Sequence, residues 1–419
     1  MTRARYRMDR LATYGFFIFM GIGTTAWLSR LPSVKQALGL KPSALALMTI
    51  LGGCGALVAM LFSGVLTNWL GVRKSMLLAV STWCLGMFIA SYAVHVESVP
   101  GVVAGLFFNS AGISLWGTVN TVEAGAVERT SEKSVMSRFH ASYSLGMFLA
   151  LALGSFLSSR GVSVPVHIAF NALATLLLIV ACIMICPTRP LGDVTTGEAG
   201  EAGPKTAAAG ADGQAPVETP SAFRKQLAAW VEPFVLMLAL IDIALEASEG
   251  AVSDWASIGL VESFKVPEHM ANLAPTVFAA AMIVSRFIGP AVIDRLGHAV
   301  GLYLTLLVSA LGIAVYSLSP NLAGSLVGTA LWGVGAALGV PIVTTLATVD
   351  PSMAAQRASV ISTAYYGVSW IIPPAIGFLG DHMGVRASVL LLSVILVLVT
   401  ALVGPVTRVK TLAGGHPRA

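Results

Sequence analysis

The sequence predicts an all-α polytopic membrane protein, and three observations carry that prediction. Apolar residues make up 56% of the 419 residues, charged residues make up 11%, and the mean hydropathy is +0.82. The apolar residues fall in twelve segments, each long enough for the roughly 20 residues that a helix needs to cross a bilayer. Charged residues gather between these segments. Soluble domains carry roughly 25% charged residues, so the composition excludes a soluble enzyme, a disordered chain and a secreted disulfide scaffold.

The twelve predicted spans form two sets of six, separated by one polar stretch. The first set covers residues 11–31, 43–69, 74–95, 99–127, 134–160 and 164–186, and the second covers 230–260, 268–293, 299–319, 321–349, 356–380 and 386–408. Residues 187–225 are rich in Gly, Ala, Pro, Thr and Glu, with no apolar period that could build a core. We therefore expect an N-terminal six-helix bundle over 1–186, a flexible cytoplasmic linker over 187–225 and a C-terminal six-helix bundle over 226–419.

The distribution of Lys and Arg predicts the orientation in the membrane. Nineteen of these residues fall on the side that holds both termini and the linker, and six fall on the other side. Because cytoplasmic loops carry the excess of positive charge, we expect both termini in the cytoplasm of a bacterial inner membrane. The net charge of +5 then reports topology rather than nucleic-acid binding.

The sequence contains no motif of catalysis or cofactor binding. The cysteines, Cys54, Cys84, Cys182 and Cys186, lie inside apolar segments without a C-x-x-C spacing, which predicts free thiols. There is no phosphate-binding loop, metal-ligand cluster or nucleophile constellation. We expect no enzyme activity, no cofactor, no metal and no ATP-driven mechanism. The short loops also disfavour a membrane receptor or scaffold.

The two halves of the sequence resemble each other. The loop after the second span reads Gly64-x-x-x-Asn68-Trp69-x-Gly71-x-Arg73-Lys74, and the loop after the eighth reads Gly289-x-x-x-x-Asp294-Arg295-x-Gly297. The fifth and eleventh spans end on matching glycine pairs, Gly154 with Gly161 and Gly377 with Gly384. Six-helix halves repeated in one orientation imply a pseudo-twofold axis along the membrane normal.

These repeated loops make the chain resemble transporters of the major facilitator superfamily, and more narrowly the YbjJ-like bacterial group. The resemblance extends to Trp27-x-x-Arg30-x-Pro32, Val122-Glu123, His140-x-x-Tyr143, Glu249-Gly250 with Asp254-Trp255, Leu331-Trp332-Gly333 and Gly377-x-Leu379-Gly380. It implies the fold of twelve transmembrane helices in two pseudo-symmetric bundles, with a central cavity lined chiefly by spans 1, 4, 7 and 10. It also implies alternating access by rocking of the two halves.

Span seven carries the sharpest chemical signal. Asp242, Glu246 and Glu249 are four and three residues apart, so they share one helical face. A carboxylate near the bilayer centre costs roughly 2.5–3.5 kcal/mol, so this face should line the cavity and serve proton or substrate binding. Glu249, which the resemblance also carries, is the first choice, and the alternative is a water-filled wall without a coupling role. Asp254 lies about 120° from this face, and we expect it to pair or to cap a helix at a gate.

Two arginines near the ends of spans are open to more than one interpretation. Arg30 lies at the outer end of span one, where it could pair with Glu249 or Asp254 and hold a gate. It could instead bind an anionic or hydroxylated substrate, or simply extend to water. Arg286 on span eight is expected to mark the cytoplasmic end and to pair with Asp294.

Aromatic and amide side chains complete the predicted binding site. Trp116 and Trp332 lie near mid-span, away from the interfacial belts where Trp is usual, and we expect them to wall the cavity. Asn120 on span four and Tyr365 on span eleven are expected to contribute polar groups. His140 on span five is more simply explained as a hydrogen-bonded structural residue than as a functional one.

The loop copies predict a cytoplasmic latch. An acidic residue there can cap a neighbouring helix N-terminus and pair with a basic residue. The first copy has Asn68 and Trp69 where the superfamily pattern has an acid and an Arg, and it keeps Arg73. The second copy keeps Asp294 and Arg295. We expect the latch to depend more on Asp294, and the alternative is ordinary loop charge set by topology.

The predicted function is a monomeric secondary active transporter that couples a small organic solute to protons by alternating access. Aromatic walls beside carboxylates favour a sugar-like solute or another polar metabolite. The alternative is a drug or metabolite exporter, or a uniporter, without obligatory coupling through the acids of span seven. The expected partners are the solute, the proton and the lipid bilayer, with no nucleic acid.

Overall fold

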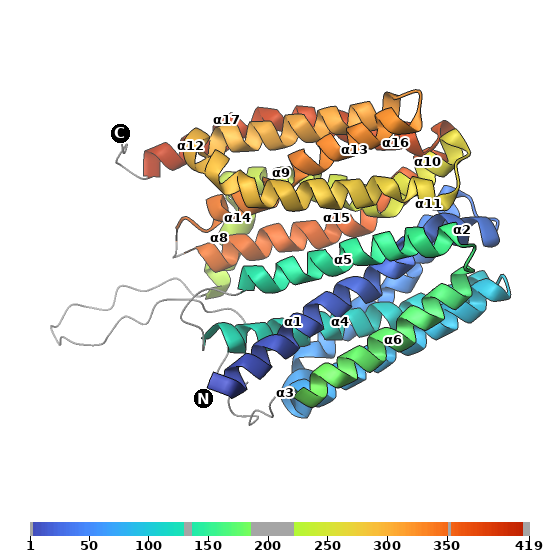
Figure 1. Ribbon diagram of the computed structural model, residues 1–419. Helices are drawn as coiled ribbons and strands as arrows, with labels where there is room; N and C mark the ends of the chain where they lie inside the picture. The colour runs from blue at the N-terminus through green and yellow to red at the C-terminus, as the bar shows by residue number, and fades with distance from the viewer. Residues whose placement is uncertain (1–2, 130–135, 186–221, 351–352, 414–419) are drawn as a thin grey trace.

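The computed structural model describes residues 3–129, 136–185, 222–350 and 353–413, and no strand occurs among them. Figure 1 shows two stacked groups of long helices, one built from residues 3–185 and the other from residues 222–413. The predicted all-α polytopic fold is confirmed. Most of the linker predicted over 187–225 lies outside the described residues, so the bundle boundaries at 186 and 226 stay a prediction.

The first group contains α1 (Arg3–Leu28), α2 (Leu31–Ala37), α3 (Pro42–His95), α4 (Val99–Arg129), α5 (Met136–Ser159) and α6 (Val164–Ile185). The long helix α3 bends at Gly71, so it supplies two spans. Glycine also sets the contact between α3 and α4. A Cβ at Gly112 would lie 2.5 Å from the backbone nitrogen of Trp83, so a larger residue would push the two helices apart.

The second group begins with α8 (Ala222–Val231), α9 (Pro233–Ala251), the π-helical turn η1 (Val252–Ala256), α10 (Ser257–Phe264), α11 (Glu268–Ala271) and α12 (Leu273–Leu318). It continues with α13 (Leu322–Ala336), α14 (Gly339–Ala347), α15 (Ala354–Met383), α16 (Val385–Val399), η2 (Thr400–Leu402) and α17 (Val403–Ala413). The segments α9, η1 and α10 follow one another without a break and form span seven. The helix α12 bends at Gly297 and supplies two spans, as α3 does.

The glycines that repeat in the sequence also repeat in backbone conformation. Gly71 and Gly297 have φ of 75° and 80°, and Gly161 and Gly384 have φ of 71° and 84°. These left-handed values are strained for residues with a Cβ but not for glycine. The two halves therefore use the same residue for the same bend at corresponding positions.

The membrane spans of the structure agree with the predicted ones. Among the described residues, nine stretches are long and apolar enough to cross a membrane. One of them, Pro42–His95, is the bent α3 and holds predicted spans two and three. Spans seven and eleven lie outside these nine stretches and coincide with α9–η1–α10 and with α15. Each predicted span thus corresponds to a helix, to half of a bent helix, or to a run of consecutive helical segments.

The two ends of the helix stack differ. Both chain termini lie at one end, here called the terminal end, and α2, α10 and α11 lie at the other, here called the α2–α11 end (Figure 1). At the α2–α11 end, Lys35 Nζ of the first group lies 2.8 Å from Glu262 Oε1 of the second. Ser43 donates a second contact between the groups, from its hydroxyl and its N–H, to the carboxylate of Asp381. Polar contacts therefore join the groups at this end.

Candidate functional site

Two adjoining cavities lie between the two groups of helices. The first, of about 300 Å³, is lined by α5, α9, η1 and α15. The second, of about 210 Å³, is lined by α1, α5, α9, η1 and α12. They share Tyr143, Met147, Glu249 and Ser253, which come from both groups. The resemblance implied walls from spans 1, 4, 7 and 10, whereas these two cavities take their walls from spans 1, 5, 7, 8 and 11.

Two of the three acids that share a face of span seven reach these cavities. Glu246 lines the first cavity and Glu249 lines both. Asp242 is only 3% exposed and lines neither of them. Within the described part of the chain, no hydrogen-bond donor contacts Glu246 or Glu249, and Asp242 Oδ1 has no partner either. The shared helical face predicts that all three acids line the cavity. Glu246 and Glu249 do so, whereas Asp242 is buried away from both cavities.

Asp254 lines the first cavity beside Glu246 and Glu249, so the expectation that it turns away and pairs or caps is wrong. The reason is the π-helical turn η1, which begins three residues after Glu249. A π turn joins residues five apart along the chain, whereas an α turn joins residues four apart. Glu249 and Asp254 are five apart and so come to the same side of the helix. The π turn extends the acidic wall by one turn.

Arg286 lies in the second cavity, and the expectation that it pairs with Asp294 is wrong. Eight residues along an α-helix separate the two by roughly 12 Å, and Asp294 is exposed with no ion pair in the described part of the chain. Arg286 instead lines the second cavity together with Glu249 and His140. Its Nε also donates to the Ala337 carbonyl oxygen at 3.4 Å. An arginine inside an apolar span indicates a functional site. From the sequence alone, Arg286 instead counts among the cytoplasmic charges that set the topology.

The two mid-span tryptophans do not wall these cavities, which corrects the prediction for Trp116 and Trp332. Both are fully buried, and neither lines either cavity. Trp116 packs edge-on against Trp83, with ring centroids 5.9 Å apart. In the second helix group, Trp332 packs edge-on against Phe278 and at a tilt against Tyr316, with ring centroids 5.8 Å and 5.9 Å apart. Each ring fills the interior of its own helix group, where an aromatic side chain buries the most apolar surface.

Asn120 lines neither cavity, and the Tyr365 side chain lies outside the described residues. Asn120 is 2% exposed, and its Nδ2 donates to the Phe16 carbonyl oxygen at 3.5 Å and to Met20 Sδ at 3.3 Å. It therefore ties α4 to α1 inside the first group. Tyr365 belongs to α15, and its side chain lies outside the described residues.

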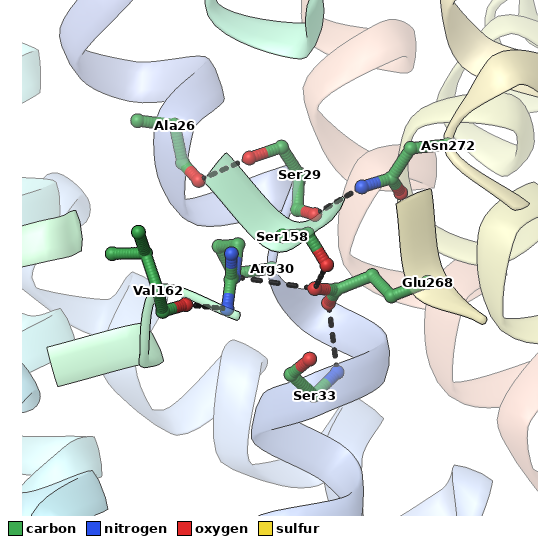
Figure 2. Close-up of polar contacts among 8 residues, drawn as sticks. All are labelled: Ala26, Ser29, Arg30, Ser33, Ser158, Val162, Glu268 and Asn272. Carbon is green, nitrogen blue, oxygen red and sulfur yellow. Dashed lines mark hydrogen bonds and ion pairs between the residues drawn. The ribbon is translucent and has the colours of Figure 1, made fainter. Parts of the chain in front are cut away.

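Arg30 pairs with neither Glu249 nor Asp254, and its partner is Glu268 at the α2–α11 end. Arg30 Nε lies 3.2 Å from Glu268 Oε2, and an Arg30 Nη donates to the Val162 carbonyl oxygen at 2.8 Å (Figure 2). Arg30 ends span one next to α2, and Glu268 opens α11. Sequence reasoning missed Glu268 because a single acid in a short loop carries no pattern.

The predicted latch residues lie apart from the cavities. Asn68, Asp294 and Arg295 are exposed, and Arg73 is half-buried and has an interaction partner. Within the described residues, Asp294 and Arg295 have neither hydrogen bonds nor ion pairs. The latch therefore stays a prediction for a conformation other than this one.

The cavities combine carboxylates, a phenol, an imidazole and a guanidinium in one polar region. Among the described residues, no group of three His, Cys, Asp or Glu side chains could hold a metal ion. Carboxylates exchange protons, and together with phenol and hydroxyl groups they hydrogen-bond polar solutes. Ionisable groups inside a membrane protein mark ion and substrate paths. The chemistry fits solute binding and proton exchange.

Comparison with known proteins agrees with this geometry. The chain is 26% identical, over 96% of both chains, to an uncharacterized MFS-type transporter of Yersinia pestis. The crystal structure of the nucleoside transporter NupG (D323A mutant) superposes with a TM-score of 0.73 at 12% identity, covering 96% of this chain and 99% of that one. A D-xylose-proton symporter superposes with a TM-score of 0.66 at 14% identity, covering 94% and 96%.

The matching family model settles the assignment, because it covers most of the chain. It describes the Major Facilitator Superfamily and matches residues 11–372. Its members are multi-pass membrane transporters and not enzymes, in accord with the helices and cavities above. The chain belongs to the Major Facilitator Superfamily.

Proposed function

We propose that this protein is a proton-coupled secondary transporter of a small polar solute, with Glu249 as the residue that exchanges the proton or contacts the solute. The observation that carries the proposal is the position of Glu249. It lines both cavities, it shares the second with the cation Arg286, and it has no hydrogen-bond donor in the described part of the chain. An acid held this way can be neutralised by a proton or by a bound group.

The cavity lining supports a polar solute. Tyr143, Ser144, Ser253 and Thr25 offer hydroxyl groups beside the carboxylates. Hydroxyls and carboxylates together satisfy the hydrogen bonds of a hydroxylated solute. The likeness to a nucleoside transporter and to a D-xylose-proton symporter is in keeping with this class, at the level of fold. A drug or metabolite exporter, or a uniporter, is the alternative.

Alternating access and orientation complete the proposal. Polar contacts join the helix groups at the α2–α11 end, and we propose that they close the cavities on that side. The excess of Lys and Arg on the terminal side favours a cytoplasmic location for that end in a bacterial inner membrane. This conformation would then be closed to the outside. One chain supplies the walls of both cavities, which supports a monomer.

The test is electrical recording on solid-supported membranes carrying the purified, reconstituted protein. Sugars, nucleosides, amino acids and organic acids are applied to the wild type and to Glu249→Gln. We expect one class to evoke a current in the wild type that Glu249→Gln abolishes. Glu97→Gln is the matched control, because the same change falls on an exposed loop acid. A current unchanged in Glu249→Gln would favour the uniporter or another acid.

A further inference from the structure

One carboxylate at the α2–α11 end contacts three residues of the first helix group, two through hydrogen bonds and one through an ion pair. Glu268 Oε1 accepts from the Ser33 N–H at 3.0 Å, and Oε2 accepts from the Ser158 hydroxyl at 2.8 Å. Oε2 also lies 3.2 Å from Arg30 Nε. Figure 2 shows all three partners converging on this one side chain. Glu268 belongs to the second helix group, so every one of these contacts crosses the interface.

Burial separates this contact from its neighbour on the same face. The side chains of Arg30 and Glu268 are 4% and 7% exposed, whereas those of Lys35 and Glu262 are 18% and 30% exposed. Removing one partner of a buried pair leaves an uncompensated charge out of water, which is far more costly than losing an exposed pair. Removal of one partner should therefore cost more at the Arg30–Glu268 pair than at the Lys35–Glu262 pair.

The carboxylate also completes a helix of the other group. Ser33 is the third residue of α2, where an N–H has no partner within the helix. The residue at the cap position, Arg30, cannot accept a hydrogen bond, and its side chain makes no cap contact. Glu268 supplies the acceptor from across the interface. Separation of the groups would thus take the counter-ion from Arg30, which keeps only its bond to the Val162 carbonyl oxygen, and the acceptor from the Ser33 N–H.

A second contact places the same segment. Asn272 Nδ2, just after α11, donates to the Ser29 carbonyl oxygen at 2.6 Å, and Asn272 is fully buried. The start of the segment that leads into α12 is therefore pinned at both Glu268 and Asn272 against the end of α1. Buried polar contacts thus hold the α11 segment against the first helix group at two residues.

We propose that Glu268 is the gating residue that holds the α2–α11 end closed, and that losing its charge shifts the resting protein toward the conformation open at that end. The proposal rests on alternating access and on the proposed orientation. It does not depend on Glu249 or on proton coupling. Glu268 is a positioning residue, because it lines neither cavity and acts through the approach of the two helix groups.

The test measures access to the cavity from each side of the membrane. Gly250 lines the first cavity, and a Cβ there meets nothing within 4 Å, so Gly250→Cys is a tolerated reporter. It is introduced into full-length protein whose native cysteines are replaced by serine. A membrane-impermeant thiol reagent is then applied to intact cells and, separately, to inverted vesicles. The readout needs neither a substrate nor transport.

Glu268→Gln should raise the labelling rate from outside about tenfold and lower it from inside. Glu262→Gln is the matched control, since it removes an acid from the less buried pair on the same face, and it should change either rate less than about twofold. Wild-type rates from both sides in Glu268→Gln would overturn the proposal. That outcome would leave the current recordings on Glu249→Gln unaffected.

A labelling rate that rises from both sides in Glu268→Gln would mean that the whole bundle has loosened. The variant Ser158→Ala then distinguishes a gating role of Glu268 from a purely structural one. That variant removes one donor and leaves both charges in place, so it should raise outside labelling about threefold while inside labelling falls. Wild-type rates in Ser158→Ala together with a loosened Glu268→Gln would overturn the gating role and leave only a structural one.

Discussion

The carboxylates at the interface between the two helix groups fall into two kinds. Glu268 receives two hydrogen-bond donors and one guanidinium at the α2–α11 end. Glu246, Glu249 and Asp254 line a cavity, and no donor in the described part of the chain contacts them. A fully satisfied acid stabilises one arrangement of the groups. An acid beside a cavity that has no hydrogen-bond donor is available to a proton or a solute. The number of polar partners thus distinguishes the carboxylate that joins the two helix groups from those proposed to bind a proton or a solute.

The largest effect on stability is expected from loss of the Glu268 carboxylate. Glu268→Ala leaves Arg30 buried without a counter-ion, which should lower the free energy of unfolding by about 3 kcal/mol. Glu249→Gln removes an acid that no hydrogen bond satisfies, so its effect on stability should stay within about 1 kcal/mol. Thermal unfolding of both variants in detergent measures the contrast. Equal losses of stability in the two variants would contradict the division into two kinds of carboxylate.

The next largest effect is expected on transport, from loss of the cation in the second cavity. Arg286→Gln removes the cation that shares the second cavity with Glu249 and His140, and we expect transport to fall about tenfold. Arg286→Lys keeps the charge and should retain most of the activity. Arg295→Gln is the control, because Arg295 lies on the same helix but is exposed. Transport that is unchanged in Arg286→Gln, measured by substrate-evoked current, would return Arg286 to a topological role.

The sequence determined the spans and the acidic wall well because both depend on local periodicity. Twelve apolar segments became helices or halves of bent helices, and the spacing of Glu246 and Glu249 placed both on one cavity. The position of Asp254 could not be predicted this way, since the π turn η1 changes the period and leaves no local signal. The burial of Trp332 could not be predicted from local sequence either, because it depends on which neighbours pack against the ring.

The pairing of Arg30 shows the limit for contacts distant in sequence. The candidates from sequence, Glu249 and Asp254, lie on the helix that pseudo-symmetry relates to span one. The observed partner, Glu268, lies beyond that helix in a short segment whose position only the assembled bundle determines. The YbjJ-like grouping, the loop latch at Asp294 and the bundle boundaries at 186 and 226 stay predictions.

A small effect on stability is expected at the Lys35–Glu262 pair, which is less buried than the pair of Arg30 and Glu268. Glu262→Gln breaks the Lys35 contact at the same face of the molecule as the Glu268 site. Water already screens this pair, so the loss of stability should stay below about 0.5 kcal/mol. Thermal unfolding measures this beside Glu268→Ala. A loss for Glu262→Gln as large as that for Glu268→Ala would mean that the interface is held by exposed charges and not by the buried pair.

The smallest effect concerns Asp381 and depends on pH. Burial opposes its ionisation, but the hydrogen bonds from Ser43 and the nearby Lys41 outweigh this and hold the pKa of Asp381 below its ordinary value. A lowered pKa means that the contact stabilises the closed end fully above the ordinary value of roughly 3.9, and that this stabilisation is lost as pH falls through the lowered pKa. Outside labelling of Gly250→Cys should therefore rise only below about pH 4. Asp381→Asn should remove this acid dependence, because its side chain does not titrate. If Asp381→Asn shows the same rise in acid, the group that titrates at this end is a different one.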